Sequence, residues 1–351
     1  MIKRKLYNRI RFAFATLGIC VLTACTGMSS FNMPAADITE TEGNISVSDN
    51  DSAVSQDLLP VNEMAEGAVE IIPDELTPEG ADLWLKEHHI YTKAEYVDIS
   101  HNDVSDVDID AIIERLPNLN RLVMIDCGLD NDGYASLQDR HPDIKIVWEI
   151  VLENWTIRTD VVAFSTFKTT AEEFYMNNDD AYYLRYCNEL VALDLGHNYV
   201  SDLSFLEYMP DLKILILVDN VKEKDGETLR HLTDLSEVRY CTKLRYLEIF
   251  ANNVSDFSFM ENLTELEDLN ISYNSVSSIQ YMTGLHNLKR LWMEHTYISY
   301  DGYCRLRQMY PNAQIVFDGE GSVDQGWRSG ARYYAMRRMF RDNVIDDLYR
   351  D

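Results

Sequence analysis

The sequence predicts an α/β solenoid with a parallel β-sheet on its concave face and short helices, 3-10 turns or loops on its convex face. The pattern L-x-x-L-x-L-x-x-N recurs along the chain, with copies 22 residues apart and one interval of 32 residues. The clearest copies begin at Leu190, Leu212, Leu244, Leu266 and Leu288. Self-similarity at a fixed period indicates one small unit that is built several times and stacked.

Each part of a copy has a physical role. Apolar residues at positions four and six alternate with residues that face the other way, as in a half-buried strand. The asparagine at position nine carries donors and an acceptor, so we expect it to satisfy backbone groups of its own and the next repeat. Ser and Asp in the recurring VSD stretch are suited to starting a short helix or 3-10 turn. No repeat can bury its apolar face alone, so neighbours must stack.

Weaker copies, with Asn102 and Cys127 at position nine, extend the pattern towards the N-terminus. The whole pattern resembles the leucine-rich repeat, and its 22-residue period with the recurring VSD is most similar to the bacterial internalin-type class. The resemblance covers roughly residues 90 to 318. It implies a protein that binds another protein through its concave face.

Residues 1 to 24 predict a bacterial lipoprotein signal peptide. Five basic residues and no acid occupy the first eleven positions, and the apolar run that follows is too short to span a membrane. The sequence LTAC resembles the lipobox, in which cleavage leaves a lipidated cysteine, so Cys25 is the expected lipidation site. An ordinary signal peptide followed by a chance cysteine is the alternative.

Residues 25 to 79 are expected to form a disordered acidic tether, because acids recur there without any Lys or Arg, and Ser, Thr, Asn and small residues fill much of the rest. Removal of the signal peptide lowers the formal net charge of the chain from −28 to −33. This charge argues against nucleic acid or anionic lipid as a partner. The lipid would then be the only attachment to the membrane of an extracytoplasmic protein at the cell surface.

The solenoid is expected over residues 80 to 318, with an irregular insertion at 149 to 189. The insertion predicts a hairpin turning near Asn154, followed by a polar helix or a degenerate repeat. It either carries function or joins two differently curved repeat blocks.

Residues 319 to 351 are expected to form a C-terminal helical cap. Apolar residues recur there at helical spacing, namely Tyr333, Met336, Phe340, Val344 and Leu348. A helix covering the open end of the solenoid is the first interpretation, and a partner-binding helix is the second. Arginines are unusually dense in this part of an acidic chain, at Arg328, Arg332, Arg337, Arg338 and Arg341. We expect them to pair with acids of the adjacent repeat.

No catalytic motif is present, so a non-enzymatic protein without cofactor or metal is expected. The acidic stretch at 103–110 fails the EF-hand register, because the positions that require glycine and glutamate hold Ala111 and Pro117. Histidines at position eight of their repeats are too far apart to share a metal. The cysteines of the repeats are expected to be free thiols, namely Cys127, Cys187, Cys241 and Cys304.

The candidate partner-binding residues face out of the inner sheet at positions three, five and seven. They are Ile214, Ile216, Val218, Tyr246, Glu248, Phe250, Asp268, Asn270 and Trp292. Their apolar members predict a continuous patch across two neighbouring strands, and a soluble surface seldom leaves such a patch uncovered without a partner. Coverage by the chain's own insertion is the alternative.

Two functions fit this face, and a scaffold without a ligand is the third interpretation of the chain. The first is a non-enzymatic, lipid-anchored surface protein that binds another protein. The second is recognition of a glycan or cell-wall polymer, in which Tyr246 and Trp292 would stack on sugars beside nearby acids.

Overall fold

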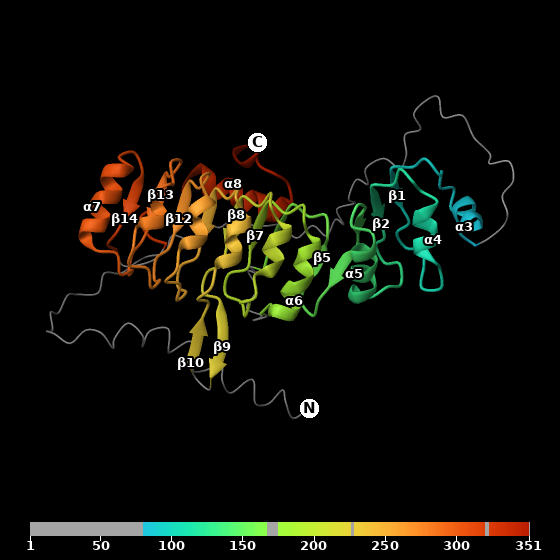
Figure 1. Cartoon of the computed structure of the whole chain (residues 1–351), viewed down its shortest axis with the longest axis horizontal. Helices are drawn as coiled ribbons and strands as arrows, with labels where there is room; N and C mark the ends of the chain where they lie inside the picture. The colour runs from blue at the N-terminus through green and yellow to red at the C-terminus, as the bar shows by residue number, and fades with distance from the viewer. Residues whose placement is uncertain (1–79, 167–174, 226–227, 320–322, 351) are drawn as a thin grey trace, which may run out of the picture. The chain divides into compact units, whose positions relative to one another are not determined.

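The structure, a computed structural model, describes residues 80–166, 175–225, 228–319 and 323–350 (Figure 1). These residues all belong to one of the two units into which the chain divides, residues 73–351. The expected signal peptide, Cys25 and the expected tether lie outside the described residues. Within the described ranges, no helix is both long and apolar enough to cross a bilayer.

The architecture is a leucine-rich repeat solenoid whose short parallel strands form two sheets. A three-stranded sheet has the order β1-β2-β3, with β1 (Tyr96–Asp98), β2 (Arg121–Val123) and β3 (Lys145–Val147). A seven-stranded sheet has the order β14-β13-β12-β11-β8-β7-β6. Its strands are β6 (Ala163–Ser165), β7 (Ala192–Asp194), β8 (Ile214–Ile216), β11 (Tyr246–Glu248), β12 (Asp268–Asn270), β13 (Arg290–Trp292) and β14 (Gln314–Val316). The predicted fold class is therefore confirmed.

The strands of the larger sheet pair in phase with the sequence repeat. Leu215 lies opposite Leu193 on one side and Leu247 on the other, and the same register continues to Leu269 and Leu291. These leucines are fully buried in one continuous core beneath the sheet. Each repeat thus completes the core of its neighbours.

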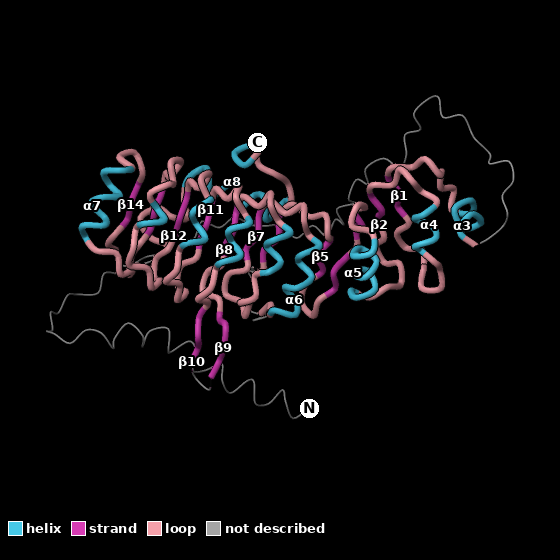
Figure 2. Tube along the Cα trace, in the orientation of Figure 1, coloured by secondary structure: helices cyan, strands magenta, loops and turns pink. Residues whose placement is uncertain are grey.

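Short helices and 3-10 turns form the convex side of the solenoid, across the core from the strands (Figure 2). The α-helices are α3 (Ala81–Glu87), α4 (Ile109–Glu114), α5 (Asn131–Arg140), α6 (Asn178–Tyr182) and α7 (Tyr300–Met309). The 3-10 turns are η1 (Tyr183–Tyr186), η2 (Ser204–Tyr208), η3 (Ser236–Tyr240), η4 (Ser258–Asn262) and η5 (Gln280–Met282). In the VSD stretches, Asp202 and Asp256 accept the backbone N–H of the serine two residues later, as their turn-forming role predicts.

Buried asparagines at position nine tie each repeat to the one before it. Asn252 Nδ2 donates to the backbone oxygens of Ile249 and Leu217, at 3.0 and 2.7 Å, and its Oδ1 accepts from Asn220 N at 3.0 Å. Asn274 repeats this arrangement one strand further on. The expectation of bonds to the next repeat is wrong in direction, because the side-chain amides of Asn252 and Asn274 reach backbone oxygens of the preceding repeat.

Only the first part of the predicted insertion at 149–189 lies between the two sheets, because β6 within that range is the edge strand of the larger sheet and pairs in parallel with β7. β3 does not pair with β6, and the chain instead forms an antiparallel hairpin of β4 (Glu149–Val151) and β5 (Thr156–Arg158), which confirms the hairpin predicted near Asn154. This placement favours a joint between two repeat blocks.

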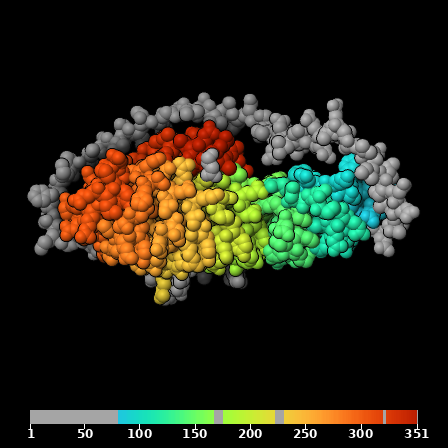
Figure 3. Space-filling model, turned by 45° about the horizontal axis from the view of Figure 1, so that its top comes forward, coloured from blue at the N-terminus to red at the C-terminus, as the bar shows by residue number. Residues whose placement is uncertain are grey.

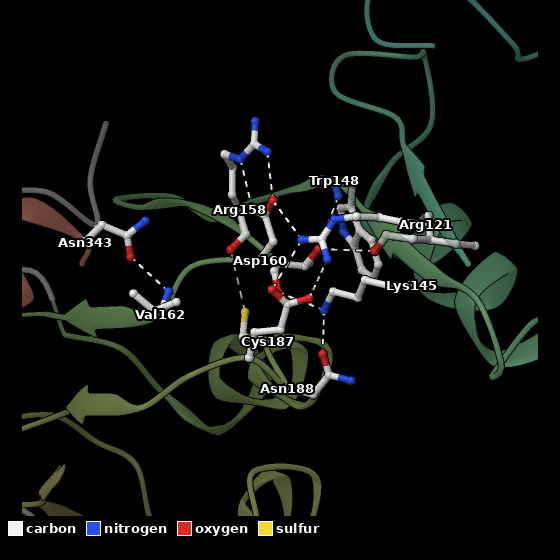
Figure 4. A network of polar contacts seen from close by, with 12 residues as sticks. Arg121, Lys145, Trp148, Arg158, Asp160, Val162, Cys187, Asn188 and Asn343 are labelled. Atoms are coloured by element: carbon white, nitrogen blue, oxygen red, sulfur yellow. Dashed lines mark hydrogen bonds and ion pairs between the residues drawn. The ribbon is translucent and has the colours of Figure 1, made fainter. Parts of the chain in front are cut away.

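Lys145 holds this joint from the N-terminal side (Figure 4). Its Nζ donates to the backbone oxygens of Thr159 and Tyr186, at 2.9 and 2.7 Å. It donates a third hydrogen bond to Asn188 Oδ1 at 2.6 Å. Burial lowers the pKa of this amine, so the three acceptors offset a cost of desolvation.

Arg121 spans the same joint. Its guanidinium donates to Glu189 Oε1 at 2.8 Å and to Asp160 Oδ2 at 3.2 Å. Burial would raise the pKa of Asp160, but hydrogen bonds and charges from Arg158 and Arg121 outweigh it and hold the pKa below its usual value. The joint is therefore a paired polar network rather than an apolar seam.

The 32-residue interval contains a second hairpin, formed by β9 (Val221–Asp225) and β10 (Thr228–His231). It projects away from the larger sheet (Figure 1).

The prediction of free thiols is confirmed for Cys127, Cys187, Cys241 and Cys304. Three of these cysteines are buried.

Candidate binding face

The concave face of the seven-stranded sheet carries the candidate residues. The structure brings them together on β8, β11, β12 and β13 or, for Val218 and Phe250, two residues after β8 and β11, at positions that face the concave side. Eight of the nine are buried and Phe250 is half-buried. The expectation that they form an open patch is wrong, because another part of the chain covers them.

The covering element is the C-terminal segment, residues 323–350, and not the insertion at 149–189. It contains α8 (Gly330–Asp342) and η6 (Asp347–Tyr349). Figure 3 shows the red end of the chain lying against the repeats. Its side chains form one cluster with the concave face, which includes Trp327, Ala335, Met336, Met339 and Tyr349. The predicted helix is present, but the prediction that it covers the open end of the solenoid is wrong, because it covers the concave face.

Trp327 is the aromatic centre of the contact and is fully buried. Its ring lies 5.3 Å from that of Tyr246 and 5.1 Å from that of Trp292, measured between centroids. The Trp292 indole Nε1 donates to Asp324 O at 3.1 Å. Full burial of one large apolar side chain stabilises by about 1.5 to 3 kcal/mol, so these rings are a main source of the attachment.

The predicted apolar stripe of the helix is confirmed in part. Met336 is buried in the cluster, and Tyr333 and Phe340 are half-buried against it, whereas Val344 and Leu348 are exposed. Ala335 and Met339 are also buried. The helix ends at Asp342 because Asn343 adopts a left-handed conformation, with φ of 51°. The Oδ1 of Asn343 also accepts from Val162 N at 2.9 Å, at the first strand of the sheet (Figure 4).

Asp268 is the fully buried carboxylate at the centre of the polar contacts. Arg290, from the neighbouring strand, donates to its Oδ1 at 2.6 Å, and Arg332 of α8 donates to its Oδ2 at 2.7 Å. Arg332 also pairs with Glu267. Burial would lower the pKa of Arg332, but Asp268 and Glu267 outweigh it and raise the pKa. One carboxylate thus joins the sheet to the helix.

Glu248 forms a second ion pair with the C-terminal segment. It is almost fully buried, and it accepts from Tyr246 OH at 2.5 Å and from Arg328 Nη2 at 3.2 Å. The expectation that the arginines pair with acids of the repeats holds for Arg328 and Arg332. Arg338 and Arg341 instead pair with aspartates inside the segment itself.

The end of the segment is held through its carbonyl groups. Lys213 Nζ donates to Tyr349 O at 2.8 Å, and Arg245 Nη1 donates to Leu348 O at 2.7 Å. Both cations stand at position two of their repeats, just before the strand. Sequence reasoning missed them and missed Trp327, although charges recurring at position two from Lys213 to Lys289 were a visible signal.

Glu294, at the end of β13, faces the beginning of the segment. Its carboxyl is fully buried, and an added Cβ at Gly319 would collide with its Oε1. Burial and, next, the Asp324 carboxyl raise its pKa to about 7. The segment therefore starts against a carboxyl group that stays protonated at pH values well above the ordinary pKa of a glutamate.

No protein-family model matches the sequence, and comparison with curated proteins finds no match. Similar solved structures include an internalin C2 of Listeria monocytogenes, which is 19% identical, with 59% of this chain and 74% of that chain covered and a TM-score of 0.33. A second internalin of that organism is 17% identical, with 67% and 73% covered and a TM-score of 0.33. A leucine-rich repeat protein of Leptospira interrogans is 17% identical, with 63% and 59% covered and a TM-score of 0.34. The fold assignment rests on the strand register of this chain itself.

Trp292→Ala is expected to destabilise the protein, because the ring is buried between the sheet and the C-terminal segment. Truncating a buried tryptophan costs about 3 to 5 kcal/mol. Urea unfolding measures the change, with Tyr297→Ala as the control because that side chain is 73% exposed. Equal small losses for both variants would show that Trp292 is not covered in solution.

Glu294 makes stability fall as pH rises. The pKa of the Glu294 carboxyl is about 7 in the folded protein, against an ordinary pKa of 4.5. Between these pH values the folded protein therefore binds more protons than the unfolded chain. Glu294→Gln should remove the loss and stabilise the protein at pH 8 by on the order of 2 kcal/mol. Melting temperatures from pH 5 to 8 test this against the exposed control Glu261→Gln, and parallel pH profiles for all three proteins would contradict it.

Proposed function

We propose that this protein is a non-enzymatic lipoprotein, anchored at the cell surface through Cys25, that binds another protein through the concave face of its leucine-rich repeats. The observation that supports the proposal is that the C-terminal segment occupies that face. It holds a helix and its flanking turns through an apolar cluster and through paired charges. A face that accommodates this segment of the chain itself has the shape and chemistry to accommodate a partner's polypeptide.

The structure gives less support to the alternative, a glycan or cell-wall polymer. The rings of Tyr246 and Trp292 would have to stack on sugars, but both are fully buried against Trp327. A polypeptide that displaces the C-terminal segment can replace the lost ring contacts and the ion pairs to Glu248 and Asp268. A neutral sugar would take Arg328 from Glu248 and Arg332 from Asp268, and Asp268 would then keep only Arg290.

The carboxylates of the face are bound rather than poised for reaction. Asp268 is held by two arginines, and Glu248 by Arg328 and the Tyr246 hydroxyl. Asp194 accepts from Ser165 Oγ at 3.0 Å and from Gly196 N at 3.0 Å. These contacts support a binding role for the face.

Photo-cross-linking on intact cells tests the site. A photoreactive residue replaces Phe250, which is half-buried at the edge of the covered face, 5.9 Å from Arg328 Cζ to the ring centroid. Tyr208 on the convex side, 42% exposed, is the matched control position. We expect a protein adduct from position 250 and none from position 208. An adduct from position 208 alone would move the site to the convex side, and an adduct removed entirely by glycan-cleaving enzymes would favour the alternative.

The anchor is tested by Cys25→Ala. The thiol would be the only point of lipid attachment, so the variant should leave the membrane fraction or remain as an uncleaved precursor. Cell fractionation and the mass of the mature protein measure this, with Cys304→Ala as the control. A Cys25→Ala protein that stays in the membrane fraction at the wild-type mature mass would contradict the proposal.

A further inference from the structure

The C-terminal segment is attached to a solenoid that is complete without it. Among the described residues, the core beneath the sheet contains none of residues 323–350, whereas the segment packs in a separate cluster on the concave face. The segment also adds no strand to the sheet, whose seven strands pair with one another. Its contacts run through side chains and carbonyl groups, as those of a ligand do.

The segment meets the face with a regular helical pattern. Arg332 is followed by Ala335, Met336 and Met339, at three, four and seven residues further on, and these spacings place all four on one side of α8. Two of them are methionines, whose flexible side chains fit irregular apolar surfaces. This is the pattern of an amphipathic helix lying in a groove.

The charges on the face require a basic occupant. Glu248 and Asp268 are 1% and 0% exposed beneath the segment, and each receives an arginine from it. Displacement of the segment takes the arginine from Glu248 and one of two arginines from Asp268, which keeps Arg290. Loss of a cation destabilises a buried carboxylate, so an occupant without cations at these two places is disfavoured. The segment itself has six arginines and four aspartates over residues 323–350, in a chain whose formal net charge is −28.

We propose that residues 323–350 are a built-in occupant of the binding face, and that the partner that displaces them is a basic amphipathic helix. The partner helix would carry an aromatic anchor at the place of Trp327 and two arginines, four residues apart, at the places of Arg328 and Arg332. Small or flexible apolar residues would lie on the same face of the helix as the second arginine. This inference rests on the proposed function, because it names the partner class of the same face.

The test uses the full chain carrying Arg328→Glu and Arg332→Glu, which turns both ion pairs into repulsions and frees the face. The probe is a fluorescent synthetic peptide of residues 323–350, and its anisotropy reports binding. We expect it to bind the double variant about tenfold or more tightly than the wild-type chain, whose face is occupied. A peptide with Arg332→Glu should bind about tenfold or more weakly than the unchanged peptide.

The matched control peptide carries Arg338→Ala and Arg341→Ala, since these arginines pair within the segment and not with the face. It should bind as the unchanged peptide does. Circular dichroism and urea unfolding establish that the double variant keeps its folded solenoid. If it does not fold, Trp327→Ala in the full chain loosens the segment without changing charge and takes its place.

Three results would overturn the inference. The first is binding of the unchanged and the Arg332→Glu peptides with equal affinity, which removes the basic specificity but leaves protein binding by the face in place. The second is equal binding of the unchanged peptide to wild-type and variant chains, which shows that the segment does not occupy the peptide's site. The third is dimerisation of the variant chain at the concentrations used, which makes a second copy the occupant. Failure of the proposed function has a different signature, namely no protein adduct from position 250.

Discussion

Stacking of three-residue parallel strands in register is the constraint on which the rest of the structure depends. No strand of this length can bury its own apolar side, so Leu215 is stabilising only between Leu193 and Leu247. The same register fixes the opposite face, because side chains alternate along a strand. Once Leu247 and Leu291 enter the core, Tyr246 and Trp292 must point to the concave side. A shift of one residue would exchange the two faces.

The concave face that results is too apolar to be left in water without a cover, and it also carries carboxylates. Ile214, Tyr246 and Trp292 supply the apolar area, and Glu248 and Asp268 stand among them. Burying those carboxylates is costly unless each is paired, so the cover has to be basic as well as apolar. The C-terminal segment meets both demands in one helix and its flanking turns. An acidic chain thus holds an arginine-rich end, and that end recognises the binding face of its own solenoid.

The elements that repeat could be predicted from the sequence. Leu247 and Asn252 are defined by a period that their neighbours share, so strand, core and turn follow from spacing alone, and the hairpin near Asn154 follows from alternating apolar residues. The cover of the face could not be predicted in this way. Trp327 and Arg332 lie outside the repeat, and no local spacing states which distant surface they meet. The helix itself was visible as a pattern, but its end was not. It ends before Asn343, so Val344 and Leu348 lie beyond it.

Amide hydrogen exchange of α8 measures directly whether the C-terminal segment occupies the concave face. An isolated helix of 13 residues is marginal in water, so its amides would exchange quickly unless packing protects them. With the segment on the face, amides 334–342 should exchange slowly in the wild-type chain and lose that protection when Arg328 and Arg332 are reversed in charge, while β11 to β13 keep theirs. Fast exchange of α8 in the wild-type chain, beside a protected sheet, would contradict that placement.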